Sequence, residues 1–204
     1  MVVEVQKGTV SGWLEISLSD GSFFMLPAAQ LYSLGWEQPG TPVVPAEAAE
    51  KQSSAWLTCI RQKAMDSLAR AEQCRAHLER KMRAKGYPAE PVRIVLDDLQ
   101  QRDLLSDLRF ARLWARNRML RRGEGPVAVS AGLRSRGVPA HIVRQALEDI
   151  QEEIPDILDT AIDRAVSRLL RLKSVRGRET LRYRLLNEGF DAELIAEELK
   201  KRQI

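Results

Sequence analysis

The sequence predicts a mainly helical protein made of three tandem three-helix repeats in an elongated arrangement, with a small β-rich element at the N-terminus. Three observations carry this prediction. The 204 residues are 44% hydrophobic and 29% charged but only 5% aromatic, a composition typical of helix-rich proteins. Glycines recur about every 50 residues within helical patterns. Alternating apolar residues, typical of strands, are confined to the start of the chain.

The β-rich element is predicted from two short runs in which apolar and polar residues alternate, 2–5 and 13–18. Asp20 and Gly21 follow the second run and precede another apolar stretch, which is a strong hairpin signal.

The end of this element is predicted from its breakers of regular structure. Residues 37–54 hold three prolines and a glycine, after a stretch at 28–34 that fits one or two helical turns. We therefore expect the β-rich element to occupy 1–45 and a linker, or the lead-in to a helix, to occupy 46–53.

The repeats are phased by Gly86, Gly137 and Gly189, which are 51 and 52 residues apart. Apolar residues stand four and eight positions before each glycine, and six and ten positions after it, so each glycine separates two amphipathic helices. Glycine suits the left-handed position that ends a helix. The apolar residue after each glycine can pack back on the last turn; these residues are Tyr87, Val138 and Phe190.

A longer helical stretch precedes each of these three pairs of helices, so that every repeat has three helices. These stretches are 54–70, capped by Ser53 or Ser54, 106–122, capped by Ser106, and 154–173. The predicted repeats are 54–105, 106–153 and 154–204. Because about 50 residues is small for a solitary core, we expect neighbouring repeats to share contacts.

The charge is distributed unevenly along the chain. Residues 1–53 hold two basic and six acidic residues, which leaves 30 basic and 22 acidic residues in 54–204. Such asymmetry favours a polyanionic partner for the basic part, and a solvated helical surface is the alternative.

The basic residues are densest in 106–122, which carries six arginines. They lie beside a stripe that is expected to be buried and consists of Phe110, Leu113, Trp114 and Asn117. The next predicted helix adds two arginines. We predict a partner-binding surface made of Arg109, Arg112, Arg116, Arg118, Arg121, Arg122, Arg134 and Arg136.

The sequence offers no constellation for catalysis. His77 and His141 have no cysteine or histidine at metal-ligand spacing, and "RRGEGP" (121–126) lacks the Lys-Ser/Thr of a phosphate loop, so we expect a turn there. Cys59 and Cys74 form no CxxC pair. Without such patterns, we expect a protein that is not an enzyme and uses no metal or cofactor. We expect it to be cytoplasmic, since the first residues do not resemble a signal peptide.

Three segments together resemble the RecX family, the bacterial regulators of the RecA recombinase. They are "SDLRFARLWARNRM" (106–119), "GEGPVAVSAGLRSRGV" (123–138) and "RAHLERKMRAKGYPAEPVRIVLDDLQQRDLLSD" (75–107). The resemblance covers nearly the whole chain and is weakest in the third repeat. Pro91 and Leu108 depart from the family pattern.

The resemblance implies a monomeric regulator that binds RecA filaments on DNA, without sequence preference, and inhibits the recombinase, ATPase and coprotease activities of RecA. It thereby implies a role in DNA repair and the SOS response. The alternative is a DNA-binding transcriptional regulator that uses its three-helix units as helix-turn-helix modules. Tight, strongly salt-dependent binding to naked DNA favours that alternative, whereas a filament regulator needs RecA for its tightest binding.

Overall fold

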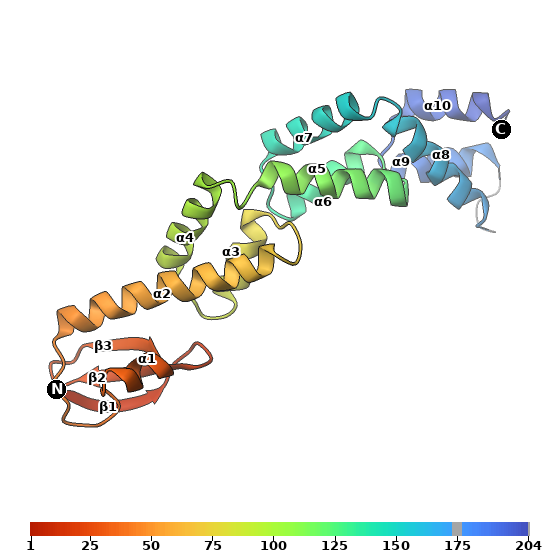
Figure 1. Cartoon of the computed structure of the whole chain (residues 1–204). Helices are drawn as coiled ribbons and strands as arrows, with labels where there is room; N and C mark the ends of the chain where they lie inside the picture. The colour runs from red at the N-terminus through yellow and green to blue at the C-terminus, as the bar shows by residue number, and fades with distance from the viewer. Residues whose placement is uncertain (173–176, 204) are drawn as a thin grey trace. The chain divides into compact units, whose positions relative to one another are not determined.

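The computed structural model describes residues 1–172 and 177–203 and is mainly helical with a small N-terminal sheet, as the sequence predicts (Figure 1). The chain divides into two compact units. Unit 1 comprises Met1–Ala71 and Leu78–Leu105. Unit 2 comprises Glu72–His77 and the described residues from Ser106 onward. No helix within the described ranges combines the length and apolar character needed to cross a membrane.

The sheet of unit 1 consists of three antiparallel strands in sequence order, β1 (Val2–Lys7), β2 (Trp13–Leu18) and β3 (Phe23–Pro27). The turn between β2 and β3 contains Asp20 and Gly21, as predicted, and Gly21 has a φ of 86°. The Asp20 carboxylate accepts hydrogen bonds from the hydroxyl and backbone N–H of Ser22, which lower its pKa.

The helices of unit 1 are α1 (Ala28–Ser33), α2 (Pro45–Leu68), α3 (Arg75–Arg83), whose first turn belongs to unit 2, and α4 (Ala89–Gln101). Residues 46–53 were expected to form a linker or the lead-in to a helix; they are helical and belong to α2, which agrees with the second alternative. Pro45 occupies the first turn of α2, where its missing N–H costs nothing, so this proline begins the helix rather than preventing it. Ser53 and Ser54 therefore lie inside α2 and do not cap it.

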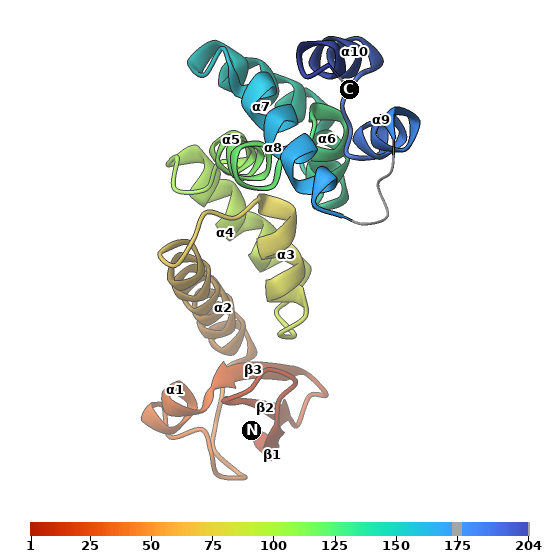
Figure 2. The same ribbon diagram turned by 90° about the vertical axis from the view of Figure 1, so that its right-hand side faces the viewer.

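The sheet and α2 share one hydrophobic core, built around three aromatic rings. The indole of Trp13 from β2 stacks on that of Trp56 from α2, with ring centroids 3.6 Å apart and planes 10° apart. Tyr87, the residue after the first repeat glycine, meets Trp56 edge-on at 5.8 Å. In Figure 2 the sheet lies against the N-terminal half of α2. The β-rich element is thus packed on the first repeat.

Unit 2 contains the remaining helices, and Ser106 caps the first of them, since its hydroxyl accepts a hydrogen bond from the Arg109 N–H at 3.2 Å. The elements are α5 (Asp107–Asn117), the π-helical turn η1 (Arg118–Arg122), α6 (Pro126–Ser135), α7 (Ala140–Glu153), α8 (Ile157–Leu170), α9 (Arg178–Asn187) and α10 (Ala192–Lys201). The third long helix was expected over 154–173, and its last residue lies outside the described residues.

The three repeat glycines have the predicted left-handed conformation, with φ values of 88° for Gly86, 90° for Gly137 and 88° for Gly189. In every repeat the residue after the glycine is buried and donates its N–H to the carbonyl five residues earlier. These bonds are Tyr87 to Met82 (3.3 Å), Val138 to Leu133 (3.2 Å) and Phe190 to Leu185 (3.3 Å). The predicted repeat phase is therefore confirmed at its three anchor points.

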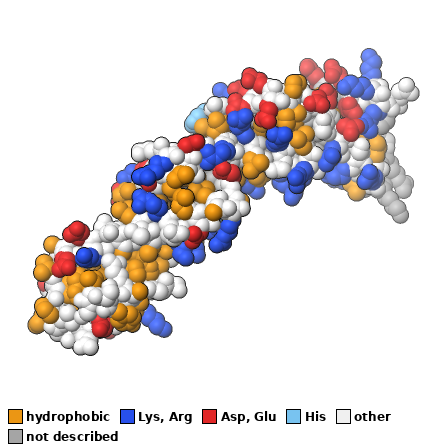
Figure 3. Space-filling model, viewed as in Figure 1, with side chains coloured by type: hydrophobic (Ala, Val, Ile, Leu, Met, Phe, Trp, Pro, Cys, Tyr) orange, Lys and Arg blue, Asp and Glu red, His pale blue; other side chains and the backbone are white. Residues whose placement is uncertain are grey.

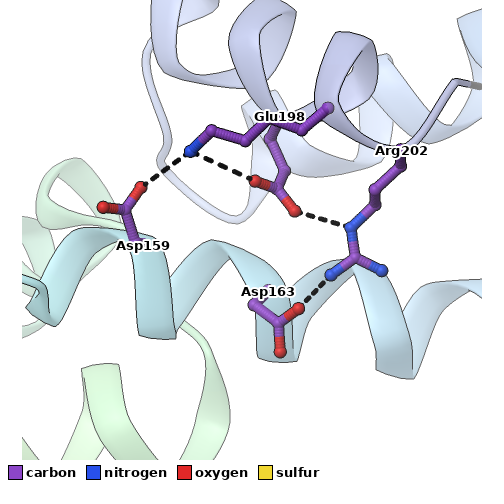
Figure 4. Close-up of polar contacts among 5 residues, drawn as sticks. Asp159, Asp163, Glu198 and Arg202 are labelled. Atoms are coloured by element: carbon purple, nitrogen blue, oxygen red, sulfur yellow. Dashed lines mark hydrogen bonds and ion pairs between the residues drawn. The ribbon is translucent and has the colours of Figure 1, made fainter.

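Ion pairs join α8 to the end of the chain's last repeat (Figure 4). Glu198 is only 7% exposed, and its carboxylate accepts a hydrogen bond from Arg202 Nε at 2.6 Å. Arg202 also pairs with Asp163 of α8. The Nζ atom of Lys201 lies 3.5 Å from Oδ1 of Asp159. This network fixes α10 against α8 and contributes to the third repeat's structure.

Candidate functional site

The arginine-rich segment begins as an amphipathic helix whose buried face is made of small residues. Ala111 and Ala115 of α5 and Met119 of η1 are fully buried and lie one helical turn apart. Arg112 and Arg116 stand on the exposed side, as the spacing predicts. The predicted buried stripe is wrong at Leu113 and Asn117, which are exposed because the face that packs inward is centred on the two alanines. The neighbours of each arginine decide what it is free to bind.

The arginines of α5 are paired with acidic residues of other segments. The pairs are Arg109–Glu72 (2.5 Å), Arg112–Asp149 (3.7 Å), Arg112–Glu153 (3.5 Å) and Arg116–Glu153 (2.9 Å). Asp149 and Glu153 belong to α7, so the pairs of Arg112 and Arg116 join the first and last helices of the second repeat. Exposed ion pairs of this kind contribute about 0–1 kcal/mol to stability, and they give each of these guanidinium groups an acidic neighbour within the protein.

Two further arginines surround Trp114. The guanidinium carbons of Arg118 and Arg136 lie 4.9 Å and 4.6 Å from the centroid of its indole ring, a cation–π arrangement. Arg118 also pairs with Glu124 at 2.9 Å. A Cβ on Gly132 would lie 2.5 Å from the indole, so α6 packs directly on the ring. Trp114 is therefore packed within the protein, and both arginines support that packing.

Arg121 and Arg122 of η1 have a different environment. Both are exposed, and neither forms an ion pair with any residue in the described part of the chain. They line a pocket of about 340 Å³, the arginine pocket, whose wall consists of Arg121, Arg122, Glu124, Arg164, Arg168 and Glu188.

The charges of the arginine pocket do not cancel. Glu188 is paired with Arg168 at 3.0 Å, and Glu124 is paired with Arg118. Arg164 of α8 donates a long hydrogen bond of 3.4 Å to the Arg121 carbonyl and forms no ion pair within the described residues. The pocket thus carries three guanidinium groups that have no acidic partner there.

Backbone contacts through glycine bring η1 and α8 together. Gly123 follows η1 with a φ of 66°, and a Cβ on it would lie 2.7 Å from the Ala165 nitrogen of α8. A Cβ on Gly125 would lie 2.3 Å from the Gly189 carbonyl, and the Gly125 N–H donates to the Glu188 carbonyl at 2.7 Å. The "GEG" segment is the expected turn between helices, and it also forms the contact between the second and third repeats.

Arg164 and Arg168 were not predicted as site residues, because they lie in the third repeat, far along the chain from η1. Their four-residue spacing places them on one face of α8, but nothing in that spacing shows that the face meets η1. Arg134, which was predicted, is exposed on α6 and forms no ion pair with a residue of the described ranges.

Charge is segregated on the surface of unit 2. In Figure 3, acidic side chains gather along its upper edge over α7 and α10, and basic side chains gather along its lower edge near α5 and α8. This face of unit 2 therefore presents a basic edge near α5 and α8.

Comparison with known proteins agrees with this architecture. Residues 106–147 match the model of the second three-helix domain of RecX. The regulatory protein RecX of Pseudomonas fluorescens is 36% identical over 105 residues, which cover 50% of this chain and 67% of that protein. The chain belongs to the RecX family.

A second RecX relative, from Halorhodospira halophila, is 35% identical over 100 residues, 49% of this chain and 62% of that protein. The chain thus spans about two thirds of the length of these RecX relatives. A crystal structure of a regulatory protein RecX superposes with a TM-score of 0.67 at 18% identity and covers 98% of both chains. That similarity supports the RecX fold across the whole chain.

Proposed function

We propose that this chain is a non-enzymatic cytoplasmic regulator that binds RecA filaments on DNA and inhibits the recombinase, ATPase and coprotease activities of RecA. Through them it modulates DNA repair and the SOS response. Membership of a family whose relatives are named regulatory proteins supports this proposal. The observation that carries it is the arginine pocket, in which Arg121, Arg122 and Arg164 lack acidic partners among the described residues.

The chemistry of arginine suits such a partner. Its planar guanidinium donates paired hydrogen bonds to carboxylates and to phosphates, and it stays charged at every physiological pH. A protein filament on DNA offers both kinds of acceptor. Of the eight arginines predicted to bind the partner, five are engaged within unit 2. We therefore place the docking surface at Arg121, Arg122 and Arg134, with Arg164 added from the third repeat.

The test is the inhibition of RecA ATP turnover on single-stranded DNA by the variant Arg121→Ala/Arg122→Ala. Losing two charge-assisted contacts of about 1 kcal/mol each weakens the apparent affinity about 30-fold. The salt dependence also becomes shallower because fewer counterions are displaced.

The matched control is Arg112→Ala/Arg116→Ala, which removes the same charge from the preceding turns. These two arginines already pair with α7, so we expect inhibition close to that of the parent. Unchanged inhibition by the first variant, with an unchanged melting curve, would exclude the arginine pocket as the docking surface. Equal affinity for naked DNA with and without RecA would favour a DNA-binding transcriptional regulator instead.

A further inference from the structure

A second basic pocket lies within unit 1, between the end of α2 and the end of α3. We call it the lysine pocket; it has a volume of about 130 Å³ and is lined by Lys63, Asp66, Ser67, Arg70, Lys81, Met82 and Lys85. None of its four cationic side chains forms an ion pair with a residue in 1–172 or 177–203. No sequence pattern pointed to this cluster, because its members come from two helices of the first repeat.

The inner wall of the lysine pocket is formed by buried side chains. Met82 is fully buried and Ser67 is only 3% exposed. The Ser67 hydroxyl accepts a hydrogen bond from Lys81 Nζ at 2.6 Å. This bond holds the ammonium group in place without neutralising it, since the hydroxyl carries no charge, and the ammonium keeps two further donors for a ligand.

The balance of charge in the lysine pocket is strongly positive. Asp66 is the one acidic group in the lining, and its carboxylate accepts a hydrogen bond from Gln62 at 2.8 Å. Four cations against one carboxylate leave a net charge of +3. Such an arrangement attracts anions electrostatically, and dissolved salt screens this attraction.

We infer that the lysine pocket binds a phosphate group of a nucleic-acid backbone. Its volume is well below the roughly 300–1,000 Å³ typical of small-molecule sites, so it fits one ionic group rather than a nucleotide. Lysine acts on phosphate as a compact point charge with rotatable donors. The lining contains no aromatic ring on which a base could stack, and the contact is therefore independent of base sequence.

This inference does not depend on RecA, and its test contains none. Fluorescence anisotropy measures binding of a labelled single-stranded oligonucleotide to the full chain over a salt series. The variant Lys63→Gln/Lys85→Gln is expected to bind about tenfold more weakly at low salt. The slope of log affinity against log salt becomes shallower by about 0.7 for each phosphate contact that is lost.

The matched control is Lys7→Gln/Lys51→Gln, which removes two lysines from the same unit outside the pocket. At about 0.1 M salt, where the Debye length is about 10 Å, it is expected to bind within about twofold of the parent, since charges farther than this from the bound phosphate are screened. Lys63→Arg/Lys85→Arg keeps the charge and should retain binding. Circular dichroism melting curves verify that all the variants are folded.

Three outcomes would overturn the inference. The first is an equal loss in the pocket variant and the control, which indicates general attraction without a site. The second is unchanged oligonucleotide binding in the pocket variant while its binding of inorganic phosphate is lost, which indicates a site for the free ion. The third is binding of a poly-glutamate peptide, but not of the oligonucleotide, through Lys63 and Lys85, which indicates docking of an acidic protein segment.

Discussion

The two halves of the arginine-rich segment, α5 and η1, hold three arginines each, yet the structure surrounds them differently. Along α5, Arg112 and Arg116 face the carboxylates of α7 and join two helices of one repeat. In η1, Arg121 and Arg122 face Arg164 of the next repeat and have no acidic partner among the described residues. The density of charge along a helix therefore does not identify a binding surface. The charge on the facing helix decides whether a cation is structural or available.

The largest effect is expected from breaking the close contact of Gly189 with α6, which joins the third repeat to the second. A Cβ on Gly189 would lie 2.3 Å from the Ala128 nitrogen, at a φ of 88°. Combining the left-handed penalty with overpacking, we expect Gly189→Ala to lower the free energy of unfolding by about 3 kcal/mol. It should also weaken binding through the arginine pocket. Thermal and urea unfolding measure the stability.

Gly177→Ala is the matched control for this prediction. Gly177 has a φ of 84°, but a Cβ there would meet no atom of the described residues within 4 Å. We expect a loss of about 1 kcal/mol from backbone strain alone. Equal losses at Gly177 and Gly189 would contradict the close approach of the second and third repeats.

A smaller effect is expected when α5 is made to resemble η1. Glu153→Gln removes the carboxylate that pairs with both Arg112 and Arg116. The stability cost should be at most about 1 kcal/mol because these pairs are exposed. The released guanidinium charge should tighten binding to a polyanion about threefold, measured with the RecA-coated DNA used above. Weaker binding would show that Glu153 itself contacts the partner.

The smallest effect concerns a comparable exposed cluster in unit 1, where Arg61 of α2 and Arg102 both pair with Asp98 of α4. Hydrogen bonds first from Arg102 and then from Arg61 lower the pKa of Asp98 below its usual 3.8. A lowered pKa stabilises the fold at pH values above 3.8, and that contribution is lost as the pH falls through the folded-state pKa.

The variant Asp98→Asn tests this contribution. We expect its melting temperature to lie slightly below that of the parent at pH 7 and to converge with it near pH 3. A gap that stays constant over this range would show that packing, and not charge, accounts for the difference.

Much of the fold could be predicted because its signals are local. A glycine, the apolar residue after it and the apolar steps around both define a helix end within about ten residues, and Gly86, Gly137 and Gly189 all repeat this pattern. The same logic failed at Pro45, because a proline that breaks a helix in its interior can also begin one.

The proposed binding surface was harder to predict because its signals are not local. Periodicity placed the buried side of α5 only in part, since Leu113 is exposed, and it could not show that Arg116 Nη1 lies 2.9 Å from Glu153 Oε1. Likewise, nothing near Arg121 in the sequence points to Arg164. Both relations depend on how one helix is placed against another, and three glycines with close backbone contacts set that placement between the second and third repeats.

The tryptophans give each unit its own optical reporter. Three of the four, including the stacked pair Trp13 and Trp56, belong to unit 1, and Trp114 belongs to unit 2. Two indoles stacked at 3.6 Å couple their electronic transitions, so near-ultraviolet circular dichroism follows the junction of the sheet with α2. Trp114 emits beside two guanidinium groups, in a setting of different polarity. A single spectroscopic titration of the unlabelled protein can therefore tell which unit unfolds first.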